Sequence, residues 1–322
     1  MKKQTNGEKR KVAVVGAGAV GSTFCYALAQ SGLADEIALI DTNSDLAKGQ
    51  VLDLAHGEPF FDTVSIYEGC PADYADAQVI VITAGTAQRP GETRLELLQR
   101  NARIIKNIVA DVVSKNAVGV MLIVSNPVDI LTHVALKCSG WPPGRVIGSG
   151  TVLDTARLRY MLSDYCGVDV HNVHAYVLGE HGDSEFAAWS LAHVAGMPID
   201  RYCAIYGEHA DWPERRAAIE RAVRDSAYHI INYKGATYFA VGLGLVRIVG
   251  AILRGQHSVL TVSTWLDGDF GLRDVTLSVP AIVSNQGVHQ IIESRLSDTE
   301  YQALSASAAV LKKAMSQLSS AV

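Results

Sequence analysis

Short apolar runs alternate with longer amphipathic segments along the first half of the chain. Runs rich in β-branched residues predict buried parallel strands at 11–15, 37–40, 79–83, 118–124 and 146–148. Helices are predicted at 22–30 and 44–54, and another follows Arg94, where Leu98, Ile105, Ile108 and Val112 form an apolar stripe. Strands that alternate with helices predict an α/β fold with a doubly wound parallel sheet up to about Gly150.

The pattern changes after Thr151. It predicts a helix at 153–166, a strand at 173–178, two long helices at 214–234 and 236–253, and antiparallel strands within 258–283. Ser297 and Glu300 form a capping box that opens a last helix, whose buried stripe is Leu304, Ala308, Leu311, Met315 and Leu318. We therefore expect two domains, a parallel-sheet domain at 1–150 and a mixed α+β domain at 151–322.

A glycine-rich turn, Gly16-Ala-Gly-Ala-Val-Gly21, follows the first predicted strand and opens a helix. Gly16 permits the tight turn, Gly18 lets a pyrophosphate approach the backbone, and Gly21 allows close helix–strand packing. Asp41 stands twenty residues after Gly21, at the end of the next strand, where a carboxylate can bind ribose hydroxyls. This context predicts a dinucleotide site; the alternative is a tight turn with incidental glycines.

Four predicted strands end at Gly16, Asp41, Gly85 and Asn126. Ligands of doubly wound sheets bind beyond the carboxyl ends of the strands, so these four positions should converge on one crevice. The polar segment 86–94 is bracketed by Gly85 and Gly91, which is typical of a mobile loop between a rigid strand and a rigid helix.

Composition narrows the class of protein. The chain has 322 residues and a net charge of −5, and this acidic balance does not suggest nucleic-acid binding. No apolar run is long enough to span a membrane. Residues 1–10 are expected to be a disordered tail, and the lysines and arginine up to Lys11 to be solvated. Five widely spaced cysteines form no CxxC pair, so we expect reduced thiols in a cytoplasmic protein and no metal site.

His181 lies in Gly-Glu-His-Gly-Asp, a glycine-flanked strand end of the kind that displays functional groups. Asp154 and Arg157 are three residues apart and share one helix face. Arg157 is suited to clamp a carboxylate, and Asp154 to hold the imidazole in one tautomer and favour its protonated form. The alternatives are a loop histidine with a structural hydrogen bond and a surface ion pair.

Six motifs in order resemble those of the L-lactate/malate dehydrogenase family, and more closely those of its bacterial L-lactate dehydrogenases. They are Gly-Ala-Gly-Ala-Val-Gly, Gln-Arg-Pro-Gly-Glu-Thr-Arg, Ser-Asn-Pro-Val-Asp, Leu-Asp-Thr-Ala-Arg, Gly-Glu-His-Gly-Asp-Ser and Lys-Gly-Ala-Thr, and the likeness covers nearly the whole chain after Lys11. The resemblance implies an NAD-binding Rossmann domain followed by a catalytic domain that binds pyruvate or L-lactate.

The resemblance also implies roles for individual residues. His181 would exchange the proton with Asp154 as its partner, Arg157 would bind the substrate carboxylate, and Arg94 would polarise the substrate carbonyl. Asn126 would orient that oxygen, and Thr237 would lie beside the substrate. The residues expected to contact NAD are Gly16, Gly18, Val20, Gly21, Asp41, Gly85, Ser125 and Asn126. Val241 is expected in the nicotinamide pocket.

Substrate choice depends on the loop Gln88-Arg89-Pro90. The family's malate enzymes carry an arginine two places before that proline, where this chain has neutral Gln88, so we expect pyruvate rather than oxaloacetate. Arg89 is the rival candidate for meeting a second carboxylate if the loop shifts. The other readings are a malate dehydrogenase and a redox-sensing NAD-binding protein without catalysis.

Arg159 and His174 match the two positions that bind fructose 1,6-bisphosphate between subunits of activated bacterial tetramers. Arg159 points about 200° from Arg157 on a helix. His174 lies seven residues before His181, which is an odd separation on a strand, if that strand is regular. Both are therefore expected away from the substrate, either as ordinary surface residues or as an effector site in a homotetramer.

Overall fold

An eight-stranded sheet forms the centre of the protein. The structure, a computed structural model, describes residues 9–87, 91–206 and 212–319. Its strand order is β14-β13-β6-β5-β4-β1-β2-β3. Six strands are parallel: β1 (Lys11–Val15), β2 (Glu36–Ile40), β3 (Ser65–Glu68), β4 (Val79–Ile82), β5 (Val120–Ile123) and β6 (Val146–Gly148). This confirms the predicted doubly wound sheet.

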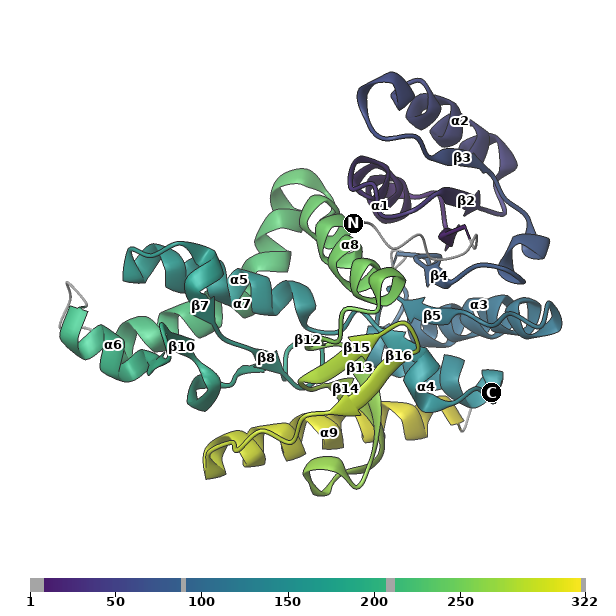
Figure 1. Ribbon diagram of the computed structural model, residues 1–322. Coiled ribbons are helices and arrows are strands. Elements are labelled where there is room, and N and C mark those ends of the chain that lie inside the picture. The colour runs from purple at the N-terminus through teal and green to yellow at the C-terminus, as the bar shows by residue number, and fades with distance from the viewer. Residues whose placement is uncertain (1–8, 88–90, 207–211, 320–322) are drawn as a thin grey trace.

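Helices cover both faces of this sheet (Figure 1). The helices of the first half are α1 (Ala19–Gln30), α2 (Ser44–Ala55), α3 (Arg94–Ser114) and α4 (Val128–Ser139). Alternate residues of each strand point to opposite faces, so Val12 and Val14 pack in the cluster that holds α1, whereas Ala13 and Val15 pack in the cluster that holds α3 and α4. Thr93 caps the start of α3, since its side chain accepts from the Glu96 N–H, and the predicted apolar stripe lies along this helix.

The second half of the chain extends the same sheet. Strands β13 (Ser263–Asp267) and β14 (Arg273–Ser278) add antiparallel to β6 at its edge. The other strands form small sheets: β7 (Val173–His174), β8 (Val177–Leu178), β9 (Phe186–Ala187), β10 (His193–Val194), β11 (Met197–Pro198), β12 (Ser258–Leu260), β15 (Ala281–Ser284) and β16 (Gly287–Ile291). The antiparallel prediction for 258–283 is confirmed.

Five helices complete the fold: α5 (Val152–Cys166), α6 (Ile199–Tyr206), α7 (Trp212–Lys234), α8 (Phe239–Arg254) and α9 (Asp298–Ser319). Helix α8 packs against α1, and α9, yellow in Figure 1, runs beneath β14. The capping box at Ser297 opens α9 as predicted, since the Ser297 N–H donates to Glu300 and the Glu300 N–H donates back. Within the described ranges no helix combines the length and apolarity needed to cross a bilayer.

Two predictions about local structure are wrong. The segment 173–178 is not one strand, because β7 pairs with β10 whereas β8 pairs with β9 in a different sheet. The basic residues at the start of β1 are not a solvated tail. Arg10 binds Asp35 through two nitrogens, and Lys11 is buried with its Nζ 2.8 Å from Asp73 and Asp76. Residues 1–8 of the predicted tail lie outside the described residues.

Candidate active site

The carboxyl ends of four parallel strands lie level with one another. Val15 pairs with Ile40 and with Ile82, and Ile82 pairs with Ile123, so each strand ends beside its neighbour. The residues that follow, Gly16, Asp41, Gly85 and Asn126, therefore lie along one edge of the sheet, as the strand pattern predicted.

Each glycine of the turn after β1 is needed for a different steric reason. Gly16 adopts φ +110°, and a Cβ there would lie 2.7 Å from Thr83 Oγ1. A Cβ on Gly21 would lie 1.9 Å from the Gly16 carbonyl oxygen, whereas one on Gly18 would meet nothing within 4 Å. The protein's own packing thus requires Gly16 and Gly21, and the open space at Gly18 is what a bound pyrophosphate needs.

The start of α1 is suited to the pyrophosphate of a dinucleotide, and the end of β2 to its adenosine ribose. Helix α1 has no acidic residue in its first turn and no side chain capping its N–H groups, so it can attract phosphates. The Asp41 carboxylate accepts hydrogen bonds from the backbone of Ala17 (2.7 Å) and Asn43 (2.8 Å). These two bonds fix the carboxylate beside the glycine turn.

The ends of β4 and β5 are held together by polar side chains. Ser125 donates to the Ala84 carbonyl oxygen (2.6 Å). Asn101, on α3, accepts from the Thr86 N–H (3.0 Å) and donates to the Asn126 carbonyl oxygen (3.1 Å). Asn101 was not predicted from the sequence, although a polar residue on the buried face of an amphipathic helix is a detectable signal.

His181, Asp154 and Arg157 form a continuous chain of contacts. Asp154 Oδ2 lies 2.7 Å from His181 Nδ1, and Asp154 Oδ1 accepts from Arg157 Nη1 at 2.6 Å. The Asp154 side chain is 2 % exposed, so this is not a surface ion pair. Burial opposes the charge of Asp154, but His181 and Arg157 outweigh it and lower the pKa of that carboxyl group.

The same carboxylate determines the state of the imidazole. Burial lowers the pKa of His181, but the charge of Asp154, reinforced by its hydrogen bond, outweighs burial and raises that pKa to about 9. A carboxylate on Nδ1 favours the N–H at that position, which leaves Nε2 to exchange a proton. The arrangement is chemically suited to donate a proton near neutral pH.

Two neighbouring cavities meet at His181. One, of about 460 Å³, is lined by Arg94, Arg157 and the apolar side chains of Leu97 and Ile231. The other, of about 170 Å³, is lined by Val20, Thr237 and Val241. Five residues line both cavities: Asn126, Arg157, His181, Ala227 and Ile231. Those predicted substrate and nicotinamide residues that the structure describes therefore surround one continuous region.

Arg94 is at the rim of this region. It is the first residue of α3, and its side chain is 86 % exposed, with Nη1 4.0 Å from an oxygen of Asp183. A guanidinium so exposed can move toward a ligand at little cost in broken contacts. Gln88 and the neighbouring Arg89 and Pro90 lie outside the described residues.

The sequence analysis also missed Asp129, the last residue of the Ser-Asn-Pro-Val-Asp motif. Its fully buried carboxylate accepts from the His181 backbone N–H (2.8 Å) and from Ser263 Oγ (2.5 Å). Burial raises the pKa of Asp129 to about 6 despite both bonds. Asp129 thereby ties the loop of His181 to α4 and β13, which only the folded chain brings together.

Arg159 points away from His181, into a separate cavity of about 490 Å³ that His171 and Arg247 also line. Its Nε donates to the Ala175 carbonyl oxygen at 3.0 Å. His174 is exposed on β7. Because the predicted strand is broken after His174, counting faces along it does not fix where that side chain points.

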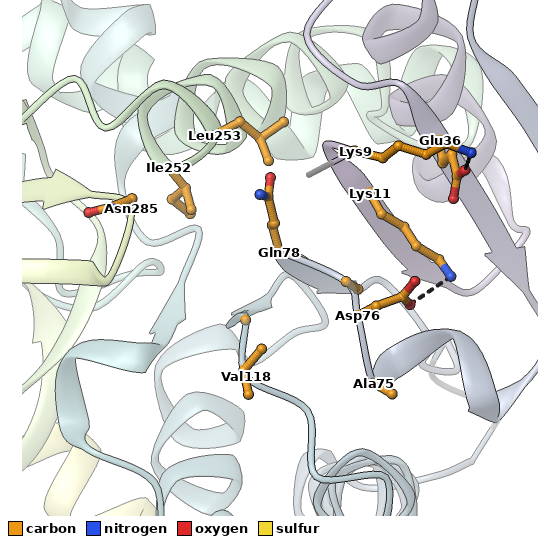
Figure 2. A pocket seen from close by; sticks show the side chains of 12 residues that line it. Lys9, Lys11, Glu36, Ala75, Asp76, Gln78, Val118, Ile252, Leu253 and Asn285 are labelled. Atoms are coloured by element: carbon orange, nitrogen blue, oxygen red, sulfur yellow. Dashed lines mark hydrogen bonds and ion pairs between the residues drawn. The ribbon is translucent and has the colours of Figure 1, made fainter. Parts of the chain in front are cut away.

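A larger cavity, of about 780 Å³, lies at the opposite edge of the sheet, where the parallel strands begin (Figure 2). Its charged groups pair with one another: Lys9 binds Glu36, and Lys11 binds Asp76. Volume alone therefore does not identify the active site, because the groups suited to proton transfer converge at the other edge.

Two protein-family models, one for each of two adjoining domains, match the chain. Residues 10–148 match the NAD binding domain of lactate/malate dehydrogenase, and residues 151–322 match its alpha/beta C-terminal domain. An L-lactate dehydrogenase of Treponema denticola is 61% identical over 315 residues, which are 97% of this chain and 99% of that protein. One of Acetivibrio thermocellus is 51% identical over 96% of this chain and 97% of its own length.

Solved structures agree with these relatives. A lactate dehydrogenase from a Medee basin deep-sea metagenome library has a TM-score of 0.94 and 44% identity, covering 97% of this chain and 100% of its own. A minor L-lactate dehydrogenase of Enterococcus mundtii, in its ligands-bound form, has a TM-score of 0.93 and 40% identity, covering 96% and 98%. The chain therefore belongs to the lactate/malate dehydrogenase family and is an NAD-dependent oxidoreductase.

Proposed function

We propose that this enzyme interconverts pyruvate and L-lactate. The observation that carries the proposal is the buried chain of contacts from His181 through Asp154 to Arg157, at a cavity with Arg94 on its rim. The names of the relatives support it, since they are L-lactate dehydrogenases.

Each residue then has a role in the reaction. Arg157 binds the substrate carboxylate, and Asn126 orients the carbonyl oxygen beside Thr237. The bound nicotinamide supplies or accepts the hydride. Arg94 stabilises the negative charge that develops on the oxygen, and His181 provides its proton or, in reverse, removes it. Exclusion of water from around the bound substrate strengthens both interactions.

The substrate preference is tested by steady-state rates with pyruvate and with oxaloacetate, each with NADH. Pyruvate should be preferred, because neutral Gln88 leaves the second carboxylate of oxaloacetate buried without a cationic partner, which costs at least about 3 kcal/mol. Gln88→Arg should move the preference toward oxaloacetate. If the unmodified enzyme already prefers oxaloacetate, malate dehydrogenase is the correct function, and Arg89 is the first residue to examine.

The cofactor NAD should be strongly preferred over NADP. Asp41 is a carboxylate that would repel a 2′-phosphate, and the following Thr42-Asn43-Ser44 offers no arginine to receive one. We expect Asp41→Ser to narrow the preference, measured as the ratio of kcat/KM with NADH and NADPH. Comparable efficiency with the two cofactors in the unmodified enzyme would contradict this reading of Asp41.

We further propose activation by fructose 1,6-bisphosphate in a homotetramer. Arg159 and His174 of two apposed subunits would repel one another when the site is empty, and a bisphosphate bridging them would favour the state that binds it better; Arg247 lines the same cavity as Arg159. Because Arg159 shares α5 with Asp154 and Arg157, the route to the active site is short.

This activation predicts a lower apparent KM for pyruvate when the bisphosphate is present. Saturation curves at neutral and acidic pH, with and without the effector, measure it. An unchanged KM at both pH values would exclude activation, and an unaltered response of Arg159→Gln would exclude the proposed site, which also includes His174.

The cysteine content supports a reducing, cytoplasmic location. All five cysteines, at positions 25, 70, 138, 166 and 203, are free thiols in the structure.

A further inference from the structure

A second carboxylate lies beside His181. Glu185 immediately precedes β9, is only 6 % exposed, and lines the same cavity of about 460 Å³. One carboxylate oxygen of Glu185, one ring nitrogen of His181 and one carboxylate oxygen of Asp154 all lie within 4.8 Å of one another. A charge so close to an imidazole in a largely buried site strongly affects whether the ring keeps its proton.

Charged groups reach Glu185 from three directions. Helix α5 contributes Asp154 and Arg157. The loop that carries Glu185 also contributes His181, on whose far side lies Asp129 of α4. Helix α7 contributes Arg224, whose buried Nε has no hydrogen-bond partner among the residues described and whose Nη2 lies 3.3 Å from Glu220. The positive groups offset part of the repulsion between the two carboxylates.

We propose that Glu185 is a second carboxylate partner of His181, whose negative charge keeps the imidazole protonated, and so able to bind the substrate oxygen, at alkaline pH. The inference rests on the proposed role of His181. Glu185 acts through that histidine, so it is a positioning residue and not a catalytic one.

The directions of the two pKa shifts agree with this role. Burial, and then the charge of Asp154, raise the pKa of Glu185 to about 8. Burial lowers the pKa of His181, but Asp154, followed by Glu185 and Asp129, outweighs it and raises that pKa to about 9. A charged Glu185 thus favours the protonated imidazole, and the protonated imidazole in turn favours the charged form of Glu185.

Glu185→Gln tests the proposal, because the amide keeps the shape of the protonated acid and cannot ionise. The measurement is the affinity of the enzyme–NADH complex for oxamate, determined from pH 6 to 10. Oxamate is an analogue of pyruvate in which an amide NH2 replaces the methyl group and the carboxylate is kept. We expect the midpoint of the alkaline loss of affinity to fall by about one pH unit, which is about a tenfold weaker affinity above the midpoint. Glu185→Asp, which restores the charge, should recover part of the shift.

Two controls separate the possible failures. Glu214→Gln removes an equal charge from the exposed start of α7 and should leave the midpoint unchanged. His181→Gln should abolish the alkaline transition; if it does not, the proposed role of His181 fails. If His181→Gln abolishes the transition but Glu185→Gln leaves the midpoint where it was, only the role of Glu185 is overturned.

A second measurement uses the wild-type protein, so it does not depend on whether a Glu185 variant folds. The ring signal of His181 in wild-type protein, assigned by its loss in His181→Gln, reports the imidazole directly by nuclear magnetic resonance. Two interacting groups predict a titration in two steps between pH 7 and 10. Two steps would support the proposal, and a midpoint no higher than that of an ordinary histidine would overturn it.

Discussion

His181→Ala is expected to lower kcat for pyruvate reduction by about 10²- to 10⁴-fold, while NADH still binds with its normal affinity. His181 is the group of the Asp154–His181 pair that has a proton to exchange, because His181 and Arg157 keep the pKa of Asp154 low and that carboxylate charged. Most of the cofactor residues lie on the glycine turn and the strand ends, and only Val20 and Asn126 of them share a cavity with His181, so the change should affect turnover far more than NADH binding.

Steady-state kinetics and NADH fluorescence measure the two halves of this prediction. His229→Ala, which changes an exposed histidine of α7, is the matched control and should behave as wild type. Near-normal turnover of His181→Ala would remove His181 from its proposed role, and a loss of NADH binding would show that the loop also shapes the cofactor site.

Arg157→Lys is expected to raise KM for pyruvate by about 10- to 100-fold, although the formal charge is unchanged. A guanidinium presents parallel N–H groups to a carboxylate, whereas an ammonium offers one charged point, so about one strong hydrogen bond is lost. Arg157 also donates to Asp154 (2.6 Å), and a lysine is poorly shaped to keep that contact and bind substrate together.

The same change should therefore affect the histidine. Without the Arg157 contact, Asp154 loses a partner that favours its charged form, and the pH profile of kcat/KM should change together with KM. Arg221→Lys, an exposed substitution on α7, is the control. If Arg157→Lys binds pyruvate as well as wild type, the substrate carboxylate is held elsewhere.

Local patterns predicted much of the fold because their causes are local. The β-branched runs define β1, β4 and β5, since alternate side chains can be buried on both faces only within a covered sheet. The glycine turn and the spacing to Asp41 follow from the steric needs of one strand–helix–strand unit. The sequence also grouped His181, Asp154 and Arg157 correctly, because two of them share a helix face.

Other features depended on partners distant in sequence. The strand predicted at 173–178 is split, because its two ends pair with different neighbours, β10 and β9, and a single-strand pattern carries no information on pairing. Lys11 is buried rather than solvated, because Asp73 and Asp76, more than sixty residues away, balance its charge.

The sequence by itself thus determined the doubly wound sheet, the glycine turn with Asp41, and the residue types of the reaction centre, because these depend on spacings within one or two elements. The tertiary structure alone decided that Asp129 holds the His181 loop and that Glu185 is buried beside the imidazole. Both results depend on α4, α5, α7 and β13 meeting around one loop, and the charge and hydrogen-bonding state of a side chain is set by what surrounds it in space, not by its neighbours in sequence.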